Sequence, residues 1–250
     1  MQTLRAAIAL ALVLFLGVWG AAAQADGPTV LASTAWTGAI AEAAGAAQVD
    51  ILASFELRHP PERDFRPGDI TRALAADVLL WAGYEGFMNQ LIAAAEIPGD
   101  RVLQIRTENT PAHLVELTRG LARLWGTEER QAAWEAEFLS VTDEIKAAAE
   151  EKNASGRRVI VVGHLAAFAE WLGYDVVATF GFEEMTPAAL HRLAQLEPDL
   201  IIDVWHNPTA EALALAADVP YVLLINFPGH AGTRTLIDVF EYNASQLGLR

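Results

Sequence analysis

Residues 158–164 read Arg-Val-Ile-Val-Val-Gly-His, an apolar run that ends in a glycine and a histidine. A continuous run of this kind predicts a buried strand of a parallel sheet. Residues 49–54, Val-Asp-Ile-Leu-Ala-Ser, predict a similar strand in the first half of the chain, and His59 follows it as His164 follows the later run. Ligands of open α/β sheets bind outside the carboxyl ends of the strands. We therefore expect His59 and His164 to face one cleft between two halves of the protein.

Strand-like and helical segments alternate on both sides of a long region that has only helical signals. If the helix that starts at Thr127 continues to about Lys152, it is roughly 38 Å long at 1.5 Å per residue. Alternation of this kind predicts the α/β class. The expected architecture is two α/β lobes with mostly parallel sheets, residues 24–125 and 154–250, joined by a connecting helix over 126–153, with a ligand cleft between them. The expected strands are 29–33, 49–54, 78–81 and 101–105 in the first lobe, and 158–163, 175–179, 200–205 and 221–225 in the second.

The first 23 residues resemble an export signal. Arg5 precedes an apolar stretch from Ala6 to Trp19, and small residues follow it in an A-x-A pattern. A cleavable signal peptide and a periplasmic location are therefore expected, with a retained membrane anchor as the alternative. The chain has no cysteine, which excludes disulfides and a lipid-modified cysteine, and its net charge of −15 argues against a nucleic-acid partner.

Two further histidines, His206 and His230, also follow predicted strands, whereas His113 and His191 lie on predicted helices, where we expect them to be solvated. Histidine nitrogen together with carboxylate oxygen suits zinc or manganese, and Asp203 offers a carboxylate near His206. An ordinary surface position is the alternative for each histidine taken alone. The sequence has no G-x-S-x-G, P-loop, G-x-G-x-x-G or H-E-x-x-H motif, so we expect a binding protein and not an enzyme.

Taken in order, several segments resemble the zinc- and manganese-binding branch of the solute-binding proteins of ABC transporters. This resemblance implies a monomer with two lobes joined by a long helix, a divalent metal ion in the cleft, and delivery of that ion to a permease in the inner membrane. It places His59 and His164 on metal-ligand positions. The segments are 29–33, 59–69, 75–80, 84–87, His164 with 168–170, 185–187, 196–199 and 240–243.

The chain departs from this family at two ligand positions. Arg106 to Glu108 stands where the family has its other first-lobe histidine, and Asn226 stands where the family has its final aspartate. The favoured interpretation is a divalent ion held by His59 and His164, with His206, His230 or Asp203 as replacement ligands. A second is a metal chelate or small anion recognised by the histidines, Arg106 and Asn226, although Arg106 could instead pair with a nearby carboxylate. A third is a secreted metal-dependent hydrolase that uses Glu62 as its general base.

Overall fold

The computed structural model describes residues 27–55, 57 and 62–250. The predicted signal peptide and His59 lie outside the described residues. The first half of the described chain forms one α/β lobe. Its elements are β1 (Thr29–Ala32), α1 (Ala35–Ala43), β2 (Gln48–Ile51), α2 (Pro67–Ala75), β3 (Val78–Trp81), α3 (Gly86–Ala94), the 3₁₀ turn η2 (Gly99–Arg101), β4 (Val102–Gln104) and α4 (Pro111–Trp125).

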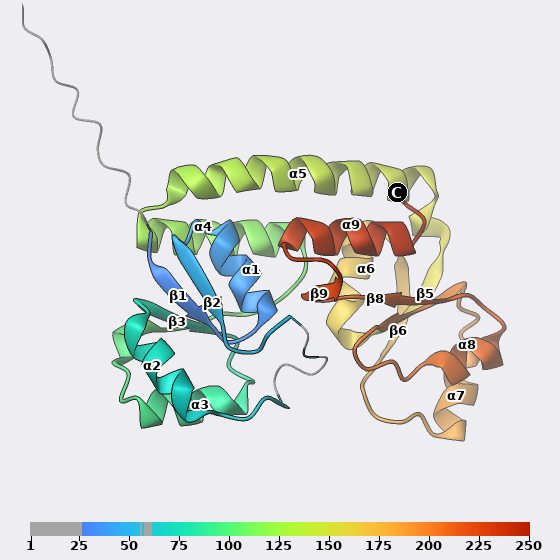
Figure 1. Cartoon of the computed structure of the whole chain (residues 1–250). Coiled ribbons are helices and arrows are strands. Elements are labelled where there is room, and N and C mark those ends of the chain that lie inside the picture. Colours follow the sequence, from blue (N-terminus) through green and yellow to red (C-terminus); the bar gives the residue numbers. More distant parts are fainter. Residues whose placement is uncertain (1–26, 56, 58–61) are drawn as a thin grey trace, which may run out of the picture.

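Helix α5 (Glu128–Glu151) leads into a second lobe that repeats this architecture, as Figure 1 shows. Within the part of the chain that the structure describes, no helix is both long and apolar enough to cross a membrane. The second-lobe elements are η3 (Ala154–Gly156), β5 (Arg158–Val162), η4 (Gly163–Leu165), α6 (Ala166–Leu172), β6 (Asp175–Phe180), α7 (Pro187–Ala194), β7 (Leu200–Val204), α8 (Glu211–Ala217), β8 (Tyr221–Leu224), β9 (Pro228–Ala231) and α9 (Leu236–Gln246).

Each lobe contains a four-stranded parallel sheet, with strand orders β2-β1-β3-β4 and β6-β5-β7-β8. The two orders are equivalent, because in each lobe the first strand is central and the chain then winds outward in both directions. The predicted α/β fold of two lobes with parallel sheets is therefore confirmed. Strands β5 and β7 are apolar and almost entirely buried, as expected for strands that are covered on both faces.

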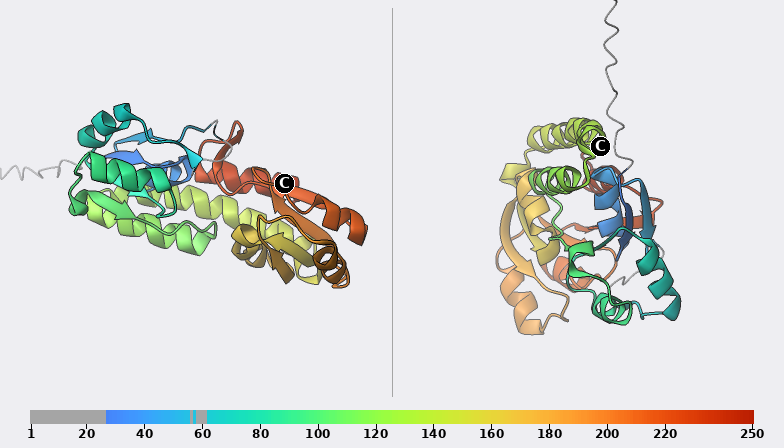
Figure 2. Two further views of the ribbon diagram at one scale, coloured as in Figure 1. Left: turned by 90° about the horizontal axis from the view of Figure 1, so that it is seen from below. Right: turned by 90° about the vertical axis from the view of Figure 1, so that its left-hand side faces the viewer.

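Helix α5 runs along both lobes, with α4 and α9 lying beneath it (Figures 1 and 2). Its 24 residues correspond to about 36 Å. Phe138, near its middle, is fully buried and packs edge-to-face on Phe240 of α9, with ring centroids 5.0 Å apart. One hydrophobic core runs from Val30 and Ile40 in the first lobe to the strands of the second lobe. This shared core restricts rigid-body motion of the lobes relative to each other.

Candidate functional site

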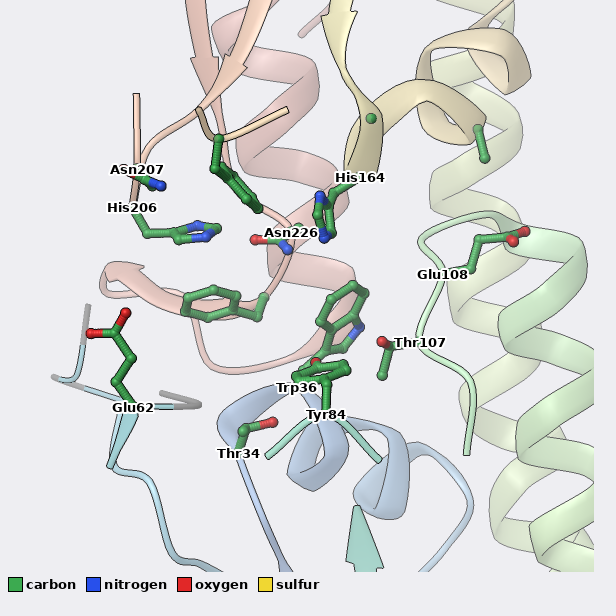
Figure 3. A pocket seen from close by; sticks show the side chains of 14 residues that line it. Thr34, Trp36, Glu62, Tyr84, Thr107, Glu108, His164, His206, Asn207 and Asn226 are labelled. Carbon is green, nitrogen blue, oxygen red and sulfur yellow. The ribbon is translucent and has the colours of Figure 1, made fainter. Parts of the chain in front are cut away.

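A pocket of about 420 Å³ lies between the lobes, at the carboxyl ends of the strands (Figure 3). The first lobe contributes residues that follow β1, β2, β3 and β4, and the second contributes residues that follow β5, β6, β7 and β8. This is the edge at which ligands bind to open α/β sheets. The lining residues are Thr34, Trp36, Glu62, Tyr84, Thr107, Glu108, Gly163, His164, Ala167, Phe182, His206, Asn207, Asn226 and Phe227.

The first-lobe wall is held by a buried glutamate. Glu85 is fully buried, and its carboxylate accepts a 2.6 Å hydrogen bond from the Ser33 hydroxyl. The backbone N–H of Ala82 donates to both carboxylate oxygens of Glu85 at 3.2 Å. These bonds tie the end of β1 to the end of β3. As a result Trp36, in the first turn of α1, and Tyr84 lie on one side of the pocket in Figure 3.

The second-lobe wall is a continuous row of aromatic rings. His164 lies 4.8 Å from Phe182, Phe182 lies 5.8 Å from His206, and His206 lies 5.2 Å from Phe227, all measured between ring centroids. His164 is in the turn η4 directly after β5, and His206 is in the loop after β7. Both predicted histidines therefore reach the same wall of one pocket.

Asp203 supports this wall from inside the lobe. The residue is 0% exposed, and its carboxylate accepts hydrogen bonds from the backbone N–H groups of Val204, Thr209 and Ala210 at 2.7, 2.7 and 2.9 Å. The Tyr221 hydroxyl donates a fourth bond at 2.8 Å. The carboxylate thus closes the loop that carries His206, and Asp203 is not among the residues that line the pocket.

Asn226 lies between the two histidines in Figure 3 and is only 5% exposed. Its backbone carbonyl accepts a 2.6 Å hydrogen bond from the side-chain amide of Asn109, which fixes the end of β8 against the first lobe. Its side-chain Oδ1 is buried without a hydrogen-bond partner, and so is Nε1 of Trp36. The pocket is therefore lined by two buried residues with unsatisfied polar atoms.

Of the predicted site residues that the structure describes, His230 and Arg106 also lie outside the pocket lining. His230, on β9, stacks on Trp205 with ring centroids 3.9 Å apart and does not line the pocket. Arg106 is also absent from the lining. Its guanidinium is 72% exposed and lies 3.4 Å from a carboxylate oxygen of Glu108 and 3.4 Å from His113. Of the seven predicted residues, the structure brings His164, His206 and Asn226 to one pocket.

The electrostatics of the pocket favour neutral rings and a ligand without negative charge. Desolvation lowers the pKa of His164, so its imidazole is neutral at pH 7 and keeps a lone pair for a ligand. Burial raises the pKa of Tyr84 to about 12, which keeps its phenol protonated. The charged lining residues among those the structure describes are both acidic, Glu62 and Glu108.

Within the described ranges, no group of three or more histidine, aspartate or glutamate side chains is arranged to hold a metal ion. Figure 3 shows the reason, because Glu62 and Glu108 lie on opposite sides of the pocket, away from the two histidines. A zinc ion needs its nitrogen ligands at about 2.0–2.1 Å and usually has four ligands in all. The described residues therefore offer two histidines on one wall and leave other ligand positions to be filled.

Sequence reasoning missed the aromatic lining, namely Trp36, Tyr84, Phe182 and Phe227. Each follows the carboxyl end of a strand, so the rule that pointed to the histidines applies equally to these rings. A search restricted to histidine and carboxylate side chains passes over them.

No protein-family model matches the chain, and no curated protein matches its sequence. Solved structures do match its fold. The periplasmic zinc-binding protein TroA of Treponema pallidum is 15% identical with a TM-score of 0.66, covering 88% of this chain and 98% of that chain. The manganese-bound periplasmic metal-binding protein of Candidatus Liberibacter asiaticus is 13% identical with a TM-score of 0.64, covering 89% and 99%.

The laminin-binding protein Lmb of Streptococcus agalactiae, described as bifunctional with adhesin and metal-transporting activity, is 14% identical with a TM-score of 0.67, covering 90% and 100%. None of these three is described as an enzyme. At such low identities the similarity establishes the fold and nothing finer. The chain has the two-lobed fold of periplasmic metal-binding proteins, as its sequence resemblance predicts.

Proposed function

We propose that this protein is a periplasmic solute-binding protein that captures a divalent transition metal, zinc or manganese, and delivers it to an ABC permease in the inner membrane. The observation that carries the proposal is the pair His164 and His206, which line one pocket between the lobes in this fold. Neutral imidazole is a good ligand for both metals. His59, whose sequence position resembles that of a family ligand, is proposed as a third.

The other ligands proposed from the sequence receive less support. The Asp203 carboxylate is already engaged by four donors, and withdrawing it would leave those donors unsatisfied inside the lobe. The His230 ring packs between Trp205 and Tyr242. We therefore assign Asp203 to loop support and His230 to packing.

The two alternative functions are weaker for similar reasons. Recognition of an anion by Arg106 is disfavoured, because this side chain is outside the pocket lining and lies near Glu108. The only observation that supports the hydrolase alternative is that Glu62 lines the pocket.

Calorimetric titration of metal-stripped protein tests the proposal. Zinc and manganese are added to the wild type, to His164→Ala, to His206→Ala and to His59→Ala, each as the free ion and as a chelate with open coordination positions. We expect about one equivalent to bind, with at least tenfold weaker binding after loss of either pocket histidine. His191→Ala is the matched control, because His191 is exposed on α7. Equal affinity in all five proteins would refute a histidine-dependent metal site.

A further inference from the structure

The pocket is much larger than a bare metal ion needs. About 420 Å³ falls within the roughly 300–1,000 Å³ of pockets that bind small organic molecules. A liquid water molecule occupies about 30 Å³, so an ion with a few waters would fill only a small part of this volume. The pocket therefore has room for an organic component beside a metal ion.

The lining is suited to flat apolar surface. Four aromatic side chains, Trp36, Tyr84, Phe182 and Phe227, line the pocket together with the two histidines. Trp36 and Tyr84 come from the first lobe and face the row of second-lobe rings in Figure 3. Aromatic walls bind planar organic groups by stacking and exclusion of water, whereas they contribute no ligand atoms to a bare zinc or manganese ion.

Two buried polar atoms of lining residues lack partners, and one of them cannot bind a metal. The indole Nε1 of Trp36 is only a hydrogen-bond donor, so it requires an acceptor atom and not a cation. Oδ1 of Asn226 is an acceptor that could bind either a donor group or a metal. Both residues are 5% exposed, which leaves these atoms few partners in the unliganded protein.

From these features we infer that the metal enters this pocket inside a small, planar organic chelate of neutral or positive charge. Histidines 164 and 206 would occupy coordination positions that the chelator leaves open, and the aromatic walls would bind the chelator. The sign of the charge follows from Glu62, because Glu108 pairs with Arg106 at 3.4 Å and the described part of the chain places no lysine or arginine in the lining. This inference rests on the proposed function and specifies its substrate class.

The test compares four probes on metal-stripped protein by calorimetry: zinc alone, 1,10-phenanthroline alone, the cationic 1:1 zinc–phenanthroline complex, and the anionic zinc–nitrilotriacetate complex. Both zinc complexes retain coordination positions for histidine. We expect zinc–phenanthroline to bind at least tenfold more tightly than each of the other three. Trp36→Phe, which reduces the area of the aromatic wall, should weaken binding of this complex about three- to tenfold and leave the affinity for free zinc unchanged.

Phe182→Ala is a second variant, chosen because Phe182 is already partly exposed and its loss should not impair folding. It should weaken the zinc–phenanthroline complex more than it weakens free zinc, because the Phe182 ring also packs against both histidines. Leu215→Ala on α8, also exposed and outside the pocket, is the control.

Free zinc that binds as tightly as zinc–phenanthroline would overturn the inference while leaving metal capture intact. Phenanthroline that binds as tightly without zinc would also overturn it, in favour of an organic cation or planar organic ligand. Absence of histidine-dependent binding for every zinc probe would instead refute the proposed function itself.

Discussion

Replacement of Asp203 by asparagine should destabilise the ligand-free protein. The carboxylate accepts four hydrogen bonds, three from backbone N–H groups and one from Tyr221. An amide of the same shape has one oxygen, so it loses at least one bond and turns one N–H group toward a donor. Hydrogen bonds to a charged acceptor contribute about 1.5–3 kcal/mol each, against about 0.5–1.5 kcal/mol for neutral pairs.

The remaining three bonds therefore lose about 1 kcal/mol each, and the fourth is lost altogether. Because a neutral amide costs less to bury than a carboxylate, part of this nominal loss of about 4.5–6 kcal/mol is recovered. We expect a net decrease of about 2–4 kcal/mol in the free energy of unfolding, which lowers Tm by roughly 4–16 °C in a protein of this size. Tyr221→Phe, which removes one donor and leaves the carboxylate, should cost about 1–2 kcal/mol.

The assay is urea unfolding of metal-stripped protein, followed by far-ultraviolet circular dichroism. Asp175→Asn, at the exposed start of β6, is the matched control and should change stability by less than about 0.5 kcal/mol. A ligand-free Asp203→Asn protein as stable as the wild type, with weakened metal binding, would refute the supporting role and restore Asp203 as a metal ligand.

Three further changes probe the fold around the pocket by the same unfolding assay. Phe138→Ala should cost about 3–5 kcal/mol, because Phe138 is fully buried where α5 packs on α9; a cost below 1 kcal/mol would contradict this packing. Gly229→Ala should cost about 1–3 kcal/mol, because φ is +132° and a Cβ would lie 2.4 Å from the carbonyl oxygen of Phe55; unchanged stability would show that this contact is absent. Burial alone would raise the pKa of Asp69, but hydrogen bonds from Arg63 and the Arg66 backbone hold this pKa below its usual value. The ionised Asp69 carboxylate therefore stabilises the fold fully above about pH 4, and this stabilisation is lost as the pH falls through the lowered pKa. Asp69→Asn should remove this part of the loss of stability at low pH. An unaltered dependence of the free energy of unfolding on pH would exclude this role of Asp69.

The fold could be predicted from the sequence because its signals are local. The apolar run at 158–163 corresponds to β5, and the helix expected from Thr127 to about Lys152 is α5, Glu128–Glu151. The two-lobed architecture could be predicted because the same alternation of strands and helices occurs in both halves of the chain. The short strand β9 was not predicted, because Pro228-Gly229-His230-Ala231 has no apolar alternation and has a turn-like composition.

The site could be predicted only in part, because a sequence gives the end of a strand and not the direction of each side chain. His164 and His206 reach the pocket, whereas Asp203, three residues before His206, turns beneath the loop to accept backbone N–H groups. His230 packs on Trp205, a tertiary contact that no spacing reveals. The unsatisfied indole N–H of Trp36 likewise depends on packing in three dimensions.

Elemental analysis of the protein, purified without affinity tag or chelator, tests metal capture most directly. The account predicts about one equivalent of zinc or manganese per chain in the wild type and in His191→Ala, and a clear loss of metal in the His164→Ala, His206→Ala double variant. A wild-type protein that carries no metal and takes up neither metal, free or chelated, after stripping would contradict it.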